Sequence, residues 1–373
     1  MDEEVQALQN NRTWILVPRL ANTNIMGSKW VFRTKYFPDG SIEHLKARLI
    51  AKGYTQVPGL DYTDTFSPVI KATTVCVVLS LAVTNHWPLR QLDVKNAFLN
   101  GHLTEQAYME QRPGYIDPRF PNHVCLLKKA LYGLKQAPHV WFQRLSSFLI
   151  HLGFYYSHAN TSLFIFRRQS DIIYLLLYVN DIILIGNNTS LLARFTCKLH
   201  SEFATKDLGS LNYFLGLKAT LTTDGPFISQ LKYARDILTH AQLLDSKPVH
   251  TPMVVSQHLS SNGPLFSDPT LYRSLVGALQ YLTITRPDIT HVVNSVNQFL
   301  HSPTEDHFLA VKRILRYVKG TLQFGLTLCP SVAPGTLVAY SDADWVECPE
   351  TRRSTSGYSI YLGNNLVSWS AKK

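Results

Sequence analysis

Residues 172–186, IIYLLLYVNDIILIG, contain two apolar runs that are separated by the polar side chains of Asn180 and Asp181. Leu, Ile, Val and Tyr favour β-strands, and each run has the length of one strand. One interpretation is a tight two-residue turn, because Asn and Asp tolerate left-handed backbone angles and hydrogen-bond their own backbone. The other is that the turn presents acidic groups to metal ions. The segment alone favours neither interpretation.

Length and composition limit the other possibilities. A chain of 373 residues is too long for one ordinary core, which predicts two or three subdomains. Lys and Arg outnumber Asp and Glu by 36 to 26, so a polyanionic partner is permitted. The five cysteines form no CxxC motif or Cys/His cluster, which argues against a zinc site or a disulfide framework. The polar start and short apolar runs predict a soluble, cytoplasmic or nuclear protein without a membrane partner.

Apolar periodicity divides the chain into a strand-rich part and a helix-rich part. Strand-like stretches within 13–52 flank the turn Pro38-Asp39-Gly40, which is typical of a basic hairpin. A second hairpin is expected around Thr223-Asp224-Gly225. The stretch SVAPGT, 331–336, predicts a boundary that is followed by three strands. Helical patterns cover 71–87, 138–152, 190–203 and four segments within 232–330.

Asp93 ends another strand-like segment, RQLDVKNAF. Nucleotidyl transfer is commonly catalysed by two divalent metals, one activating the attacking hydroxyl and the other stabilising the leaving pyrophosphate. Hard magnesium ions need carboxylate oxygens that are brought together from separate strands. Asp93 and the pair Asn180-Asp181 have an arrangement of this kind, although an Asp at the end of an apolar strand is weak evidence by itself.

Several longer motifs occur in one order along the chain. They are LKARLIAKGYTQVPGLDYTDTFSPV, QLDVKNAFLNGHL, ALYGLKQAPHVWF, YVND, FATKDLGSLNYFLGL, YRSLVGALQYLTITRPDI, and AYSDADW with RRSTSGY. Together they closely resemble the reverse transcriptase of copia-type LTR retrotransposons. The resemblance implies an α+β right-hand polymerase followed by a truncated RNase H-like β-sheet. The expected divisions are fingers and palm over 1–230, a helical thumb or connection over 231–335, and an RNase H-like remnant over 336–373.

The same resemblance assigns roles to single residues. Asp93 and Asp181 are the expected magnesium ligands, and Asn180 occupies a third catalytic position. Arg48 is similar to a residue that contacts the incoming triphosphate, with a solvated surface arginine as the alternative. Phe98 is similar to the aromatic residue that excludes a 2′-hydroxyl, with a place in the strand core as the alternative.

Further positions in the motifs carry weaker assignments. Tyr132, Gly133 and Lys135 fall where the family packs the templating and incoming bases, and the glycine would let backbone approach closely. Lys206 is a candidate for protonating the pyrophosphate, although a lone lysine in a loop is usually solvated. These assignments imply RNA or DNA template–primer and dNTPs as partners.

One residue departs from the family at the position that matters most. The family's turn reads YVDD, whereas this chain has YVND. Asn180 keeps one carbonyl oxygen but loses a full negative charge, so it cannot replace a carboxylate that bridges two cations. His139 and Asn160 also depart from the usual pattern. The sequence therefore predicts an impaired RNA-directed DNA polymerase; the alternatives are an inactive relic that at most binds nucleic acid, and a host-recruited interaction protein.

The last strands resemble the opening of an RNase H domain. Asp342 in AYSDADW matches its first catalytic Asp, but the Glu and the further Asp residues that a nuclease needs do not follow. We therefore expect no working nuclease here. An apolar face is predicted for this tail, and it should lie against the preceding helices or be poorly ordered. The residues of that face are Leu337, Ala339, Tyr358, Ile360, Leu366 and Trp369.

Overall fold

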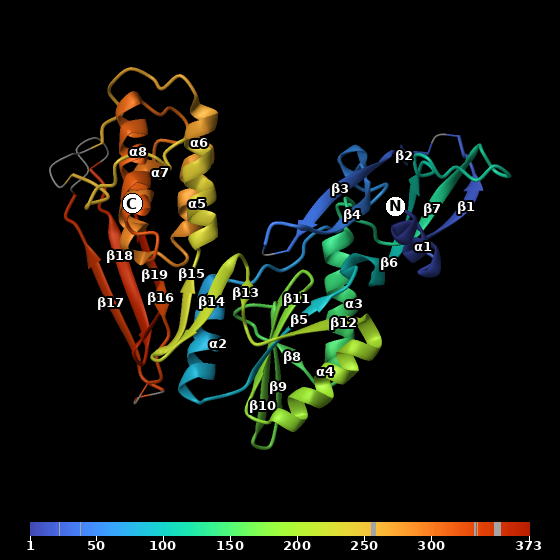
Figure 1. Ribbon diagram of the computed structural model, residues 1–373, viewed down its shortest axis with the longest axis horizontal. Coiled ribbons are helices and arrows are strands. Elements are labelled where there is room, and N and C mark those ends of the chain that lie inside the picture. The colour runs from blue at the N-terminus through green and yellow to red at the C-terminus, as the bar shows by residue number, and fades with distance from the viewer. Residues whose placement is uncertain (22, 38, 255–258, 332, 334, 347–351) are drawn as a thin grey trace. The chain divides into compact units, whose positions relative to one another are not determined.

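The computed structural model describes residues 1–373 except 22, 38, 255–258, 332, 334 and 347–351. The chain forms two compact units, each containing helices and sheets, so it is a mixed α/β protein (Figure 1). The first unit comprises Met1–Ile70, Arg90–Leu184 and Asn188–Gly209, and the second comprises Lys71–Leu89, Ile185–Asn187 and Ser210–Lys373. The finer divisions expected at 230 and 335 stay predictions, and the segment SVAPGT includes two residues outside the described ones.

A six-stranded sheet forms the centre of the first unit, with the strand order β12-β5-β11-β10-β9-β8. Helices α3 (Ala137–His151) and α4 (Thr189–Phe203) confirm two of the predicted helices. The strands of this sheet are β5 (Leu89–Val94), β8 (Tyr155–Tyr156), β9 (Leu163–Arg168), β10 (Asp171–Tyr178), β11 (Asp181–Gly186) and β12 (Thr205–Gly209).

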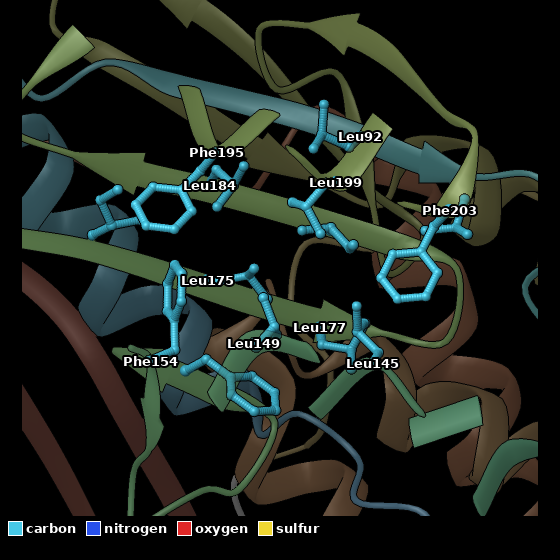
Figure 2. Packing of buried hydrophobic residues seen from close by; sticks show 14 of the residues in the cluster. Leu92, Leu145, Leu149, Phe154, Leu175, Leu177, Leu184, Phe195, Leu199 and Phe203 are labelled. Atoms are coloured by element: carbon cyan, nitrogen blue, oxygen red, sulfur yellow. The ribbon is translucent and has the colours of Figure 1, made fainter. Parts of the chain in front are cut away.

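Both helices pack on one face of this sheet because their apolar side chains join the same buried cluster as alternate strand residues. The cluster takes Leu92 from β5, Leu175 and Leu177 from β10, and Leu184 from β11 (Figure 2). Helix α3 contributes Leu145 and Leu149, and α4 contributes Phe195, Leu199 and Phe203 (Figure 2). Since strand side chains alternate between faces, the residues between these leucines point to the opposite face.

The rest of the first unit contains a two-stranded hairpin and a four-stranded sheet of order β1-β7-β6-β2. The hairpin pairs β3 (Ser28–Tyr36) antiparallel with β4 (Ile42–Ala51), as the sequence predicted, although Pro38 of its turn lies outside the described residues. Helix α1 and strands β6 and β7 were not predicted. The remaining elements are α1 (Asp2–Asn10), β1 (Trp14–Pro18), β2 (Ile25–Met26), η1 (Gly53–Thr55), η2 (Ala97–Asn100), β6 (His102–Met109) and β7 (His123–Lys129).

The second unit contains α2 (Ala72–Thr84), four later helices and two sheets. The predicted hairpin around residue 224 is confirmed by the antiparallel pairing of β14 with β15. None of the helices in the described part of the chain has the length and apolar composition needed to cross a membrane. The elements are β13 (Tyr213–Phe214), β14 (Leu217–Thr222), β15 (Gly225–Ser229), α5 (Leu231–His240), α6 (Pro269–Leu282), η3 (Pro287–Ile289), α7 (Thr290–Asn297), α8 (Glu305–Gly320), β16 (Leu326–Thr327), β17 (Leu337–Ala343), β18 (Ser356–Leu362) and β19 (Asn365–Lys372).

The three predicted tail strands form an antiparallel sheet of order β17-β18-β19. Strand β19 packs against α2 and α7, and the Trp369 indole N–H donates to the Thr283 carbonyl at 3.1 Å. The single apolar face expected from the sequence is wrong. A register shift after Ile360 places Ile360 opposite Ser368 and Trp369 opposite Ser359, so Trp369 lies on the other face from Ile360. Alternation counted along each strand could not detect this bulge.

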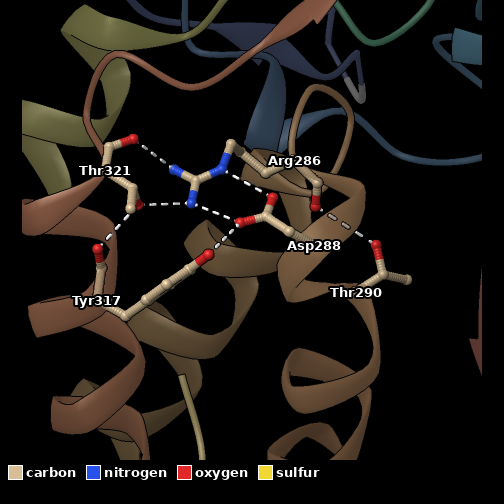
Figure 3. Close-up of polar contacts among 5 residues, drawn as sticks. All are labelled: Arg286, Asp288, Thr290, Tyr317 and Thr321. Carbon is tan, nitrogen blue, oxygen red and sulfur yellow. Dashed lines mark hydrogen bonds and ion pairs between the residues drawn. The ribbon is translucent and has the colours of Figure 1, made fainter. Parts of the chain in front are cut away.

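A buried polar network surrounds η3 in the second unit (Figure 3). The Arg286 guanidinium donates from Nε and Nη2 to both carboxylate oxygens of Asp288, at 2.9 and 2.7 Å. It also donates to the backbone and side-chain oxygens of Thr321, and the Tyr317 hydroxyl donates to Asp288. Burial raises the pKa of Asp288, but the bonds and charge of Arg286 outweigh it and leave that pKa below its usual value. The Arg286 side chain is only 3% exposed, so its charge depends on this partner.

We expect Asp288→Asn to lower the free energy of unfolding by about 2–4 kcal/mol at pH 7, because it leaves a buried guanidinium without a counter-charge. The lowered pKa of Asp288 means that its stabilisation is present above about pH 4 and is lost as the pH falls further. The variant should therefore lose less stability than the wild type on acidification. Chemical denaturation at pH 7 and pH 3.5 measures both effects, with exposed Asp236→Asn as the control; equal losses in the two variants would contradict the expectation.

Candidate active site

The turn between β10 and β11 differs from the predicted one by one residue. Tyr178 ends β10 and Asp181 begins β11, so the two loop residues are Val179 and Asn180 rather than Asn180 and Asp181. Val179 has a φ of 53°, a left-handed conformation that is costly for a β-branched residue. Its carbonyl accepts a 2.6 Å hydrogen bond from the indole N–H of buried Trp141. Helix α3 therefore holds this turn in a strained shape, which is a common property of functional sites.

Strand alternation brings the two predicted carboxylates to one face of the sheet. Leu92 and Val94 of β5 and Ile182 of β11 lie in the cluster under α3 and α4. Asp93 and Asp181 are their neighbours in the chain, so both point to the opposite face. Strands β5 and β11 are adjacent in the sheet, which places the two side chains beside each other.

Asn180 joins this pair through its side chain and its backbone. The Asn180 amide Nδ2 donates to Asp93 Oδ1 at 2.5 Å, and its backbone carbonyl accepts from the Val94 N–H at 2.8 Å. The three residues that the sequence grouped as catalytic are therefore adjacent in the structure. The amide nitrogen, not an oxygen, faces the Asp93 carboxylate.

The surroundings of Asp181 disfavour the ionised form of its carboxyl group. Partial burial, followed by the nearby charge of Asp93, raises the pKa of Asp181 to about 6. Both causes disfavour the ionised form, so a cation placed between the two carboxylates would be attracted. A shifted carboxyl group beside a like charge is a frequent mark of a functional site.

The donor set does not fit a pair of magnesium ions. Within the described residues, no three His, Cys, Asp or Glu side chains come together as a metal site would require. Asp93 and Asp181 offer carboxylate oxygens, but the Asn180 amide donates a hydrogen bond to one of them. That Asp93 oxygen is therefore already engaged as an acceptor, and the third position adds no charge.

Three of the predicted substrate-binding residues lie together, and one of them, Tyr132, is within the electrostatic influence of Asp93. The Arg48 guanidinium of β4 lies over the Tyr132 ring, 4.9 Å from its centroid. The Phe98 ring contacts Tyr132 edge-on, with the centroids 5.0 Å apart. Phe98 is partly buried and packs against the apolar clusters beneath it, so its core role is observed and its proposed contact with a sugar stays a prediction.

Gly133 allows the close backbone approach that the sequence predicted. It has a φ of 94°, and a Cβ there would lie 2.1 Å from the Ala51 carbonyl oxygen. The backbone of Gly53 approaches it equally closely, since a Cβ on Gly53 would lie 2.0 Å from the Gly133 carbonyl oxygen. Any other residue at 133 would separate β4 from the segment that carries Tyr132.

Lys135 is held by a loop for which sequence reasoning gave no role. Its ammonium donates to the Gln56 carbonyl and the Tyr62 hydroxyl, each at 3.3 Å. Gln56 also bonds the side chain of fully buried Gln136, and Gln136 donates to the Asp61 carbonyl. A pair of glutamines in two separate motifs gave no signal in the sequence, because nothing there shows that they meet.

The other candidates lie in different settings. Lys206 of β12 is paired opposite Asp93 of β5, so the two side chains share a face of the sheet. His139 bonds the Phe66 carbonyl, and buried Asn160 accepts from the Ser162 N–H. Asp342 belongs to the second unit, where it is exposed on β17 and accepts from the neighbouring Ala343 N–H.

Comparison with known proteins supplies the family. Residues 11–255 match the model of the family described as "Reverse transcriptase (RNA-dependent DNA polymerase)". The whole chain aligns with retrovirus-related Pol polyproteins from transposons RE1 and RE2 of Arabidopsis thaliana, at 49% and 48% identity, and from transposon TNT 1-94 of Nicotiana tabacum, at 37%. It covers 26%, 26% and 29% of those proteins, so it spans about a quarter of their length.

We expect Asp181→Asn to stabilise the protein at pH 7.5 by about 1–2 kcal/mol, a value discounted for partial exposure. The folded-state pKa of about 6 lies above the usual value of an Asp, so the wild type loses stability as the pH rises from about 4 to about 6. The gain should therefore disappear at pH 4. Thermal melting at both pH values measures it, with exposed Asp64→Asn as the control; an equal gain at both pH values would contradict the prediction.

Proposed function

This chain belongs to the reverse transcriptase family of copia-type retrotransposon Pol polyproteins, and we propose that it is an RNA-directed DNA polymerase domain whose nucleotidyl transfer is impaired by Asn180. Its partners would be an RNA or DNA template–primer and dNTPs. The proposal rests on family membership for the reaction, and on the site around Asp93 for the impairment.

In this proposal the six-stranded sheet that carries Asp93 and Asp181 acts as the palm. The β3–β4 hairpin and the four-stranded sheet act as fingers, and the helices between 231 and 335 act as the thumb or connection. The sheet β17-β18-β19 corresponds to the RNase H-like part, with Asp342 at its first acidic position. The excess of Lys and Arg over Asp and Glu, 36 to 26, supports a nucleic-acid partner.

The contact between Asn180 and Asp93 is the observation that carries the impairment. Magnesium binds carboxylate oxygens, and in two-metal nucleotidyl transfer such ions activate the attacking hydroxyl and stabilise the leaving pyrophosphate. Here the Asn180 amide occupies one oxygen of Asp93. The site therefore offers the ions one carboxylate fewer than the YVDD turn of the family.

Asn180→Asp should raise the rate of primer extension on an RNA template by roughly a hundredfold or more. A ligand that stabilises the transition state by several kcal/mol is worth a factor of ten for each 1.4 kcal/mol or so. The measurement is single-turnover extension by purified protein in the presence of Mg²⁺. The Asn180→Ala variant is the matched control, because it removes the hydrogen bond to Asp93 without adding a carboxylate.

The variants Asn180→Asp and Asn180→Ala distinguish a missing metal ligand from a steric block by the amide. A gain with Asn180→Asp alone supports a missing metal ligand, whereas an equal gain with Asn180→Ala would mean that the amide blocks the site sterically. Robust wild-type synthesis that the Asp variant leaves unchanged would show that Asp93 and Asp181 suffice. No extension by any variant would favour a relic that at most binds nucleic acid.

Binding of a template–primer duplex should survive the loss of chemistry, because phosphate contacts by basic side chains need no metal pair. We expect the affinity to fall on the order of a hundredfold between about 50 and about 200 mM salt. The double variant Lys46→Ala with Arg48→Ala should weaken dNTP binding more than duplex binding. Fluorescence anisotropy measures the duplex; binding that is independent of salt would remove nucleic acid from the partners.

A further inference from the structure

The acidic first turn of α1 is held against the hairpin that carries Arg48. Val5 and Leu8 are buried, and Leu8 lies in one apolar cluster with Leu49 of β4. The Leu8 carbonyl accepts from the Thr13 hydroxyl at 2.9 Å, which fixes the end of the helix. Because α1 is anchored at these points, the side chains of its first turn have fixed places beside β4.

Of the three acidic residues in that turn, Glu4 differs from its neighbours. Asp2 and Glu3 are exposed, whereas Glu4 is half-buried. Acidic residues in a first turn also stabilise a helix through its dipole, and this suffices to explain an exposed Glu3. It does not explain why Glu4 is half-buried where α1 packs against β4.

The carboxylate of Glu4 lies in the electrostatic field of the predicted triphosphate site. Burial raises the pKa of Glu4 above its usual value, although the nearby charges of Lys46 and Arg48 act in the opposite direction. Burial is also the main cause of the raised pKa of Tyr132, the residue beneath Arg48, and the charge of Glu4 adds to it. Lys46 and Arg48 point to the same face of β4, since they are two residues apart in one strand.

We propose that Glu4 is a determinant of triphosphate affinity, because its carboxylate competes with the substrate's phosphates for Lys46 and Arg48. This inference rests on the proposed function and adds a residue that its motifs do not include. The substrate class is a nucleoside triphosphate, which the same cations would bind through its phosphate oxygens.

The charges and the hydrogen bonds of Lys46 and Arg48 would both allow a phosphate to replace the Glu4 carboxylate. The single charge of Glu4 lies in the field of two cations, so Glu4 only partly neutralises them. The Arg48 Nε is buried and finds no hydrogen-bond partner among the described residues. A phosphate carries several acceptor oxygens, and it could satisfy this donor and both charges at once, whereas Glu4 does not bond Nε.

The test is a titration of the full chain with inorganic tripolyphosphate, followed by calorimetry in low-salt buffer without metal. Glu4→Gln keeps the size of the side chain and one acceptor oxygen but removes the charge. Its Kd for tripolyphosphate should be about three- to tenfold lower than that of the wild type. Glu3→Gln, which removes the same charge from the exposed side of the turn, should change the Kd less than about twofold.

The outcomes distinguish this inference from the proposed function. An unchanged or higher Kd in Glu4→Gln, or an equal decrease in Glu3→Gln, would overturn the competition while leaving the polymerase proposal intact. A decrease that persists when Lys46 and Arg48 are also changed to Ala would overturn it too, because the anion would then bind elsewhere. No binding by any of these proteins would overturn both the inference and the triphosphate role of Arg48.

Discussion

The alternation of side chains along β5 and β11 is the constraint on which the site depends. One set of residues, represented by Leu92 and Ile182, must enter the core beneath α3 and α4. The intervening residues, Asp93 and Asp181, are then forced onto the other face at adjacent strands. A shift of either strand by one residue would bury a carboxylate and expose a core side chain. The hydrophobic core therefore fixes the geometry of the polar site.

This dependence explains why the sequence could group Asp93, Asn180 and Asp181, which the structure places side by side, but could not predict the contacts between them. Two apolar runs of strand length predict both strands, and the Asp at the end of β5 follows from its segment. The position of the turn was off by one residue because Asn-Asp has the better turn chemistry, whereas core packing of Ile182 requires β11 to begin at Asp181. The turn propensity of Asn180-Asp181 was therefore outweighed by the packing of the next residue, Ile182, in the core.

Other features had no local signal at all. Helix α1 is short and buries only Val5 and Leu8, so its periodicity is too weak to identify. The pair Arg286 and Asp288 is separated by one residue in the chain, and nothing in that spacing reveals that Tyr317 of α8 and Thr321, just after it, complete the network. The bulge after Ile360 changes the faces of the tail sheet without a glycine or proline to mark it. The network and the bulge are long-range properties, which local sequence patterns do not encode.

The hydrogen bond from Asn180 to Asp93 would be lost if the Asn180 amide were hydrolysed. Asparagine side chains hydrolyse slowly to carboxylates, with loss of ammonia, and the reaction needs the following backbone nitrogen to reach the side-chain carbonyl. Asn180 lies in a two-residue loop, and its amide is half-exposed. Hydrolysis at Asn180 would replace the amide that donates to Asp93 with a carboxylate, and would so place two like charges side by side at the position that decides the charge of the site.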